Sequence, residues 1–281
     1  MRTERGNSEP VLTDEQRRCF HEDGFVRLEG AVDEREVARM RERLWHLLEH
    51  RGSRRDEPST WRHEHAVHLQ HIRDADSDPH ACRPLVEALD DLIGAGAWRT
   101  GTHWANALVT FPNAVTWDVP HNPWHLDYAY DFPRDAIWGA NVFLFLDEVL
   151  PRGGGTVVLR GSPLLTARFL ERLRPANRTQ KQHRLAFQSS HPYLTALADP
   201  ADTDDRVRRF TEVDTDVDGV PARVVELTGS AGDLVLCHPW LVHNVAPNAL
   251  DRPRMMRVIR VHHVEALKRF GSGEPEAHEV A

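Results

Sequence analysis

The chain has 281 residues, 40% of them hydrophobic and 28% charged, which provides apolar material for a packed core and excludes global disorder. A net charge of -8 argues against nucleic acid as the main partner, because binding to a phosphate backbone requires a cationic surface. The sequence contains no run of about 18 apolar residues, so it predicts no membrane-spanning helix. A small-molecule partner fits this composition better.

Residues 1–10 are polar and lack the apolar core of a signal peptide, so we expect a flexible leader and a cytoplasmic protein. The three cysteines, Cys19, Cys82 and Cys237, lie far apart and have no CxxC spacing. They indicate reduced thiols rather than a disulfide framework or a structural zinc site. The 18 histidines are the unusual feature, because histidine is a common metal ligand.

The chain is predicted to begin with a helix, a strand and a second helix. Thr13 and Gln16 have the spacing of a capping box, so a helix should start there and end near Gly24. Residues 25–28 alternate like a short strand, and residues 33–50 carry apolar side chains at helical spacing. A further short helix is expected over residues 84–92.

The pattern then changes to short β-branched or alternating runs that turn residues separate. These runs are residues 104–111, 137–146, 156–160, 223–227, 233–237 and 255–263. They have no fixed repeat, and helices do not alternate regularly with them, which disfavours solenoids and doubly wound α/β folds. The sequence therefore predicts a mainly β fold with flanking helices and a double-stranded β-helix core, that is, a cupin-like jelly roll.

Two segments interrupt the predicted strands and are expected to lie over one mouth of the core. Residues 164–197 are predicted to be mainly helical, and residues 199–219 to form an aspartate-rich loop. The helical segment is basic, which indicates either a solvated face or a site for an anionic substrate; its cations are Arg168, Arg172, Arg174, Arg178, Lys181 and Arg184. We expect one domain over residues 11–270, with lid insertions near 160–220, and a flexible tail over 271–281.

His125 and Asp127 provide the sharpest chemical signal. On a strand, residues two apart face the same side, so this pair would chelate one Fe(II), Mn(II) or Zn(II) ion. A third ligand is needed, and His243, which follows a predicted strand, is the best candidate. Two histidines and one aspartate form a facial triad that leaves open coordination positions. An arginine on the next antiparallel strand would place a cation within one small-molecule length of the metal.

With these residues in place, the sequence resembles the phytanoyl-CoA hydroxylase (PhyH)-like family of Fe(II)/2-oxoglutarate-dependent dioxygenases. Segments 12–26, 125–127, 151–162 and 232–254 carry the resemblance, in the family's order. The resemblance implies a cytoplasmic oxidoreductase that binds Fe(II), 2-oxoglutarate and dioxygen.

The resemblance also implies roles for individual residues. His125, Asp127 and His243 would bind the iron, and Arg254, eleven residues after His243, would hold the distal carboxylate of 2-oxoglutarate. A planar guanidinium matches a carboxylate in bidentate fashion. Arg252 is the alternative for this role. By analogy with the family, Thr156 would donate a hydrogen bond to the cosubstrate, although it is equally an ordinary turn hydroxyl.

The expected reaction is oxidation, most simply hydroxylation, of an unactivated C–H bond in a small-molecule metabolite, with release of succinate and CO2. Natural-product biosynthesis is one expected setting, and the protein is expected to be a monomer or homodimer. Asp127 fills the position that a halide would need, which disfavours halogenation. The alternatives are a zinc-dependent hydrolase with the same three ligands and a non-catalytic jelly-roll binding protein.

Other residues near these motifs have both a structural and a functional interpretation. The histidine-rich segment 61–71 either is structural or lines the substrate pocket, and it lies far upstream of the predicted core. His121 and His238 are either ordinary polar residues or orient a metal ligand. Trp240 belongs either to the core or to the wall of the metal site.

Overall fold

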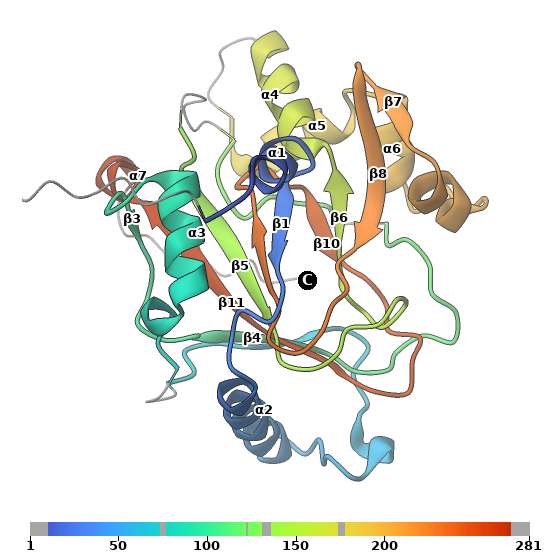
Figure 1. The fold of residues 1–281 in the computed structure, drawn as a ribbon. Helices are drawn as coiled ribbons and strands as arrows, with labels where there is room; N and C mark the ends of the chain where they lie inside the picture. The colour runs from blue at the N-terminus through green and yellow to red at the C-terminus, as the bar shows by residue number, and fades with distance from the viewer. Residues whose placement is uncertain (1–10, 74–76, 122, 131–135, 174–177, 271–281) are drawn as a thin grey trace, which may run out of the picture.

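Two antiparallel β-sheets form the centre of the computed structural model, which describes residues 11–73, 77–121, 123–130, 136–173 and 178–270 (Figure 1). The helices are α1 (Asp14–Glu22), α2 (Glu34–Glu49), α3 (Arg83–Ile93), α4 (Ser162–Arg172), α5 (Gln180–Gln188), α6 (Pro192–Ala198) and α7 (Val264–Phe270). Three shorter helical turns cover Pro58–Thr60, Pro79–Ala81 and Arg208–Glu212.

The larger sheet has the strand order β1-β9-β5-β11-β4-β2, with β3 paired to β11, and the smaller has the order β10-β6-β8-β7. The strands are β1 (Phe25–Leu28), β2 (Val67–Leu69), β3 (Trp98–Arg99), β4 (Asn106–Thr110), β5 (Gly139–Phe145), β6 (Thr156–Arg160), β7 (Thr215–Val217), β8 (Val220–Glu226), β9 (Leu234–Cys237), β10 (His243–Val245) and β11 (Arg254–His263). All of these pairings are antiparallel, as in a jelly roll.

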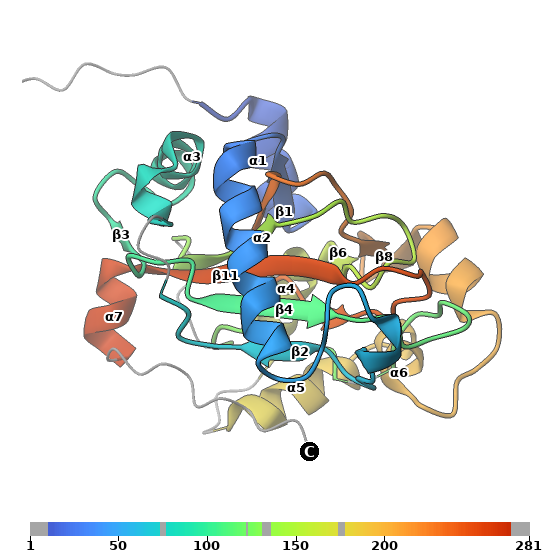
Figure 2. The same cartoon turned by 90° about the horizontal axis from the view of Figure 1, so that it is seen from below.

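The alternation of side chains along the strands separates three apolar clusters. On β11, Met255 and Ile259 face outward and pack with α1, α2 and α3, and Figure 2 shows α2 crossing β11 and β4. Met256 faces the opposite way, into the space between the two sheets, where it meets Val158 of β6. The helices α4, α5 and α6 pack on the outer side of the smaller sheet. The inner faces of both sheets are therefore the surfaces on which an enclosed site is built.

The predicted fold class and the first elements are confirmed. The side chain of Thr13 accepts a hydrogen bond from the Gln16 amide, and Gln16 caps the Thr13 amide in return, so α1 begins with the expected capping box. The Asp33 side chain likewise caps α2 by accepting from the Arg35 amide. The basic segment forms α4, α5 and α6, as expected.

One prediction about a connecting segment is wrong. Residues 199–219 are not a plain loop, because they contain the helical turn Arg208–Glu212 and strand β7, which pairs with β8. The histidine-rich segment, although far upstream in the sequence, joins the larger sheet, because β2 pairs with β4 at one edge. Both strands have only three residues, which is too short for their alternation to be recognised.

Within the described part of the chain, none of the helices combines the length and the apolar character that crossing a membrane requires. The predicted leader and C-terminal tail, residues 1–10 and 271–281, lie outside the described residues.

Candidate metal centre

The three predicted ligands lie together between the two sheets. One ligand atom from each of His125, Asp127 and His243 lies within 4.8 Å of the others. The Nε2 atom of His243 is 3.4 Å from Oδ2 of Asp127, and Nε2 of His125 is 4.0 Å from Oδ1. Two imidazole nitrogens and one carboxylate at this spacing fit one divalent ion, and they are the donor set of non-haem Fe(II) sites.

His125 does not lie on a regular strand, which corrects the expected basis for its pairing with Asp127. It forms an isolated antiparallel bridge with His243, in which each backbone amide donates to the other residue's carbonyl, at 3.1 and 3.0 Å. Asp127 follows in a bend. The long-range bridge to β10 brings the two histidines together, and the bend then turns the carboxylate toward them.

Backbone carbonyls orient both imidazoles. Nδ1 of His125 lies 3.0 Å from the Pro123 carbonyl, and Nδ1 of His243 lies 3.0 Å from the Leu241 carbonyl. If each Nδ1 carries the proton and donates to its carbonyl, the lone pair is on Nε2, which faces Asp127. Burial and the neighbouring His243 lower the pKa of His125 to about 4, so this imidazole is neutral near pH 7. His121 and His238 are therefore not needed to orient the ligands.

Two side chains that the sequence analysis missed hold the Asp127 carboxylate. Asn141 donates to Oδ2 at 2.6 Å, and Arg260 donates to Oδ1 at 3.1 Å. These residues are register partners on β5 and β11, so they project from the same face of the sheet. Burial favours the neutral acid, but His243 and Arg260 hold the pKa of Asp127 well below its usual range. The sequence signal that could have identified them is the presence of polar residues at inward positions of two otherwise apolar strands, β5 and β11.

Arg254 opens β11 and is only 2% exposed. Its Nε donates to the Gly154 carbonyl at 2.7 Å, its Nη1 to the Leu108 carbonyl at 3.2 Å, and its Nη2 to Oγ1 of Thr110 at 2.7 Å. A guanidinium has five N–H donors, so these three bonds leave two for a ligand. Among the described residues, no carboxylate lies within ion-pairing distance of Arg254, although Glu226 acts on it electrostatically. Burial lowers the pKa of Arg254 to about 10.

The alternative arginine is placed differently. The Arg252 side chain is 45% exposed and lies 3.4 Å from a carboxylate oxygen of Glu148 at the surface. Burial therefore favours Arg254 over Arg252 as an anion ligand. One expectation about this region is wrong, because β10 and β11 belong to different sheets and are not neighbours. Arg254 approaches the site from the sheet opposite His243.

Thr156 begins β6, with its side chain facing the larger sheet. It is 4% exposed, and among the described residues its hydroxyl has only the sulfur of Met256 as a partner, at 3.9 Å. A thioether is a weak acceptor, so the hydroxyl retains the capacity to donate to a ligand. The preceding glycine-rich turn is tight, because Gly154 has φ of +78° and an added Cβ would lie 2.9 Å from Asn248. This turn places the Gly154 carbonyl within hydrogen-bonding distance of Nε of Arg254.

The histidine-rich segment divides between the two expected roles. His63 stacks on Phe111, with ring centroids 4.8 Å apart, and its Nε2 lies 2.8 Å from the Ser53 hydroxyl, which is a structural role. His68, on β2, is the register partner of Leu108, whose carbonyl accepts a hydrogen bond from Arg254, so His68 lies near the buried arginine.

Trp240 combines the two interpretations that the sequence left open. It is 7% exposed, and its Nε1 donates to the Ala129 carbonyl at 3.2 Å, two residues beyond Asp127. It is thus a buried residue that also fixes the segment carrying the metal ligands.

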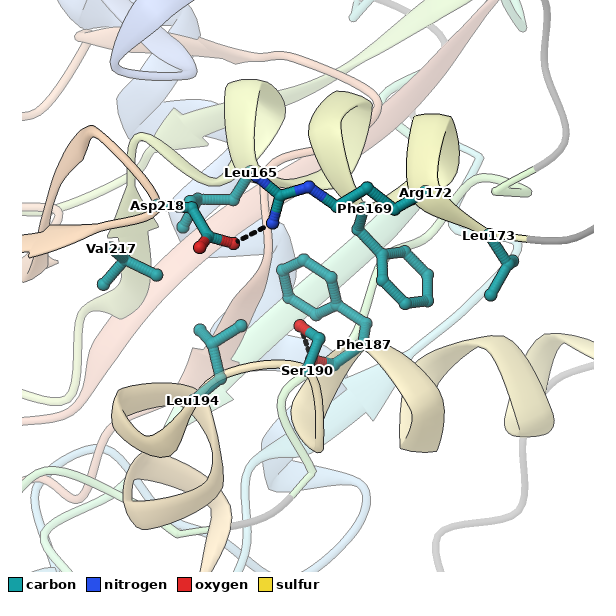
Figure 3. Close-up of a pocket in the computed structure, with 9 residues that line it drawn as sticks. All are labelled: Leu165, Phe169, Arg172, Leu173, Phe187, Ser190, Leu194, Val217 and Asp218. Atoms are coloured by element: carbon teal, nitrogen blue, oxygen red, sulfur yellow. Dashed lines mark hydrogen bonds and ion pairs between the residues drawn. The ribbon is translucent and has the colours of Figure 1, made fainter.

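A separate cavity of about 220 Å³ lies among α4, α5 and α6 (Figure 3). The aromatic rings of Phe169 on α4 and Phe187 on α5 lie between the two helices, and an ion pair of 2.7 Å joins Arg172 to Asp218. None of the three metal ligands lines this cavity. It arises where α4, α5 and α6 pack together, and it is separate from the metal centre.

A facial set of two histidines and one carboxylate on a jelly roll defines a class, the mononuclear non-haem metal enzymes. The chain belongs to the phytanoyl-CoA dioxygenase (PhyH) family, whose sequence model matches residues 20–256. This family consists of Fe(II)- and 2-oxoglutarate-dependent dioxygenases, so the predicted family, enzyme class and cofactors are confirmed. No curated protein sequence matches the chain.

Solved structures share the fold. AviO1 from Streptomyces viridochromogenes Tue57 is 19% identical with a TM-score of 0.51, over 92% of this chain and 97% of AviO1. EvdMO1 is 21% identical with a TM-score of 0.53 over 89% of this chain, which spans about half (49%) of EvdMO1. The epimerase SnoN, in complex with Fe3+, α-ketoglutarate and nogalamycin RO, is 17% identical with a TM-score of 0.48, over 89% of this chain and 83% of SnoN.

Proposed function

We propose that this protein hydroxylates an unactivated C–H bond of a small-molecule metabolite, with 2-oxoglutarate as cosubstrate and release of succinate and CO2. In this proposal His125, Asp127 and His243 hold Fe(II), and Arg254 and Thr156 hold 2-oxoglutarate. The observation that carries it is the buried guanidinium of Arg254, which forms no ion pair with a described residue and lies on the same inner face of β11 as Arg260, the residue that binds Asp127. A buried cation without a direct ion-pair partner is unfavourable unless an anion neutralises it.

The donor atoms of the site fit both Fe(II) and 2-oxoglutarate. The metal ligands offer two imidazole nitrogens and one carboxylate, which suit Fe(II). When bound, iron and 2-oxoglutarate supply the activation of dioxygen, and the protein supplies binding, orientation and exclusion of water. Asn141 and Arg260 fix the Asp127 carboxylate in position.

Arg254 has an orienting role in the proposal. Its three bonds to the Gly154 and Leu108 carbonyls and the Thr110 hydroxyl fix the plane of the guanidinium, so its two remaining N–H groups point in a set direction. A dicarboxylic cosubstrate held there by one end would present its other end to the metal ligands. Because the Asp127 carboxylate fills one position at the metal, we expect hydroxylation rather than halogenation. A place in natural-product biosynthesis stays a prediction.

An anaerobic absorption titration tests the proposal. Metal-free protein is titrated with Fe(II) and then with 2-oxoglutarate, and the weak visible charge-transfer band of the chelate is followed. We expect a band that requires both additions and is much weaker in Arg254→Ala, whereas Arg252→Ala, the exposed neighbour, retains it. Tight stoichiometric metal binding without a band would instead indicate the zinc hydrolase. Absence of metal binding would indicate a binding protein.

A further inference from the structure

The inner face of β11 carries an arginine near each end. Arg254 and Arg260 are six residues apart, so they project from the same face of the strand, roughly 20 Å apart along it. Between them Met256 and Val258 face the apolar space between the sheets. Arg254 is 2% exposed, whereas the Arg260 side chain is 36% exposed. The strand therefore presents one cation at a closed end and one at an open end.

Arg260 retains donors after it has bound Asp127. Its Nη2 bonds to Asp127 at 3.1 Å, and no other described residue accepts a side-chain hydrogen bond from this guanidinium. Nε and Nη1 are therefore available at a partly exposed position. The proposed binding of 2-oxoglutarate by Arg254 does not involve these donors of Arg260.

Helix α5 lies across the segment that carries the metal ligands. Gln188 donates to the Trp124 carbonyl at 3.2 Å, Gln180 accepts from the Tyr130 amide at 3.4 Å, and the His183 ring lies 5.5 Å from that of Tyr130. Residues 180, 183 and 188 share one helical face, and position 184 belongs to the same face. Arg184 is thus placed toward the metal-ligand segment.

Arg184 is half-buried on that face, and no described residue forms a hydrogen bond or an ion pair with it. It acts electrostatically on both His125 and Tyr130, in agreement with its position over this segment. Other cations of the lid are different: Arg168 and Arg172 bind the Asp218 carbonyl and carboxylate, respectively, and Lys181 is exposed. Arg184 is the lid cation that combines burial, absence of a described partner and proximity to the site.

The exposure of the ligands shows which side of the metal centre is open. The side chain of His125 is 33% exposed, compared with 18% for Asp127 and 11% for His243. His125 is the ligand that Arg184 influences, and Asp127 is the ligand that Arg260 contacts. Among the described residues, Asp127 is the only carboxylate that pairs with either arginine, and a bound metal would share its charge.

We propose that Arg184 and Arg260 form an anion subsite at the open side of the metal centre, and that the substrate carries a carboxylate or phosphate group that binds there. This inference rests on the proposed function, because it assigns Arg254 to 2-oxoglutarate and so leaves the other two arginines for the substrate. Guanidinium groups bind both kinds of anion through charge-assisted hydrogen bonds.

The test uses matched probes on the full chain, loaded with Zn(II) as a redox-inert stand-in and saturated with 2-oxoglutarate. Dissociation constants are measured by ligand-observed NMR for 3-phenylpropanoate, phenyl phosphate and the neutral 3-phenylpropanamide. We expect at least one anion to bind about tenfold more tightly than the amide. The tighter of the two anions identifies the group. Arg184→Gln should remove this preference, whereas Lys181→Gln, the same charge change one turn earlier on α5, should retain it.

Equal affinities for all three probes in the unaltered protein would overturn the subsite, and so would an equal loss of preference in Lys181→Gln. Binding of Zn(II) and 2-oxoglutarate by the Arg184→Gln protein, measured by calorimetry, shows that the variant is folded. The same measurement separates the two proposals. A protein that does not bind 2-oxoglutarate contradicts the proposed function, whereas one that binds it and shows no anion preference contradicts only the subsite.

Discussion

The two ends of β11 place the same residue type in opposite environments. Arg254 lies at the closed end, where two backbone carbonyls and a threonine hydroxyl fix it and water has almost no access. Arg260 lies at the open end, has one bond to Asp127, and is partly exposed. In our proposals, burial and existing bonds, rather than residue type, distinguish the arginine that holds the constant cosubstrate from the one that is left for a variable substrate.

Replacing Asp127, the carboxylate of the candidate metal centre, should have the largest effect. We expect Asp127→Ala to lower Fe(II) affinity by about 100-fold or more and to abolish 2-oxoglutarate-dependent release of succinate, because one of the three ligands is lost. Metal content and succinate formation check this. Asp147→Ala, at a carboxylate that is 41% exposed and pairs with Arg41, is the matched control. Unchanged turnover in Asp127→Ala would refute the triad.

Altering the closed end alone should separate cosubstrate binding from metal binding. We expect Arg254→Lys to raise the 2-oxoglutarate concentration for half-saturation by about 100-fold, because lysine lacks the planar fork that matches a carboxylate. Fe(II) affinity should change little, since Arg254 contacts none of the ligands. Saturation curves with Arg252→Lys as the control distinguish the two arginines. An equal effect in both variants would remove the distinction drawn from their burial.

The carboxylate support at the open end should have a smaller effect. Asn141→Ala removes the hydrogen bond to Oδ2 of Asp127 and leaves the contact with Arg260. We expect Fe(II) affinity to fall about tenfold, as is typical when a residue that orients a metal ligand is replaced. Competition with a chelator of known affinity measures it. A variant that binds iron as tightly as the unaltered protein would show that Arg260 alone orients Asp127.

Acid should destabilise the fold by a route independent of either arginine. Burial, together with the nearby His21, lowers the pKa of His238 to about 3, and its Nδ1 accepts from the Trp240 amide at 3.0 Å. Between pH 6.5 and 3 the unfolded chain takes up a proton that the folded protein excludes, so stability present above pH 6.5 is lost as the pH falls. We expect about 1–2 kcal/mol less stability at pH 5 than at pH 7.5.

Urea unfolding at the two pH values measures this change. His238→Asn retains an acceptor for the Trp240 amide but does not titrate, so its stability should depend less on pH. If the two proteins show the same pH dependence, other groups are responsible for the acid sensitivity.

Local patterns in the sequence determined a large part of this protein. The capping box of α1, the helical periodicity of α2 and the short apolar or β-branched runs of β5, β6 and β11 depend on residues close in sequence, so they were predictable. The three residues of the candidate metal centre, which the structure brings together, were also selected from the sequence. The HxD spacing and the resemblance to the family identified them, although His125 reaches its position through a bridge rather than a strand.

Only the tertiary structure decided the surroundings of those ligands. The burial of Arg254 beside the exposed Arg252, the support of Asp127 by Asn141 and Arg260, and the placement of Arg184 over the site all depend on pairings between segments distant in sequence. Desolvation and the set of available partners are properties of the folded environment, and a local sequence pattern carries no information about them. The sequence therefore determined the elements and the candidate ligands, whereas the packing between the sheets and of helix against loop set the burial and the partners of each arginine.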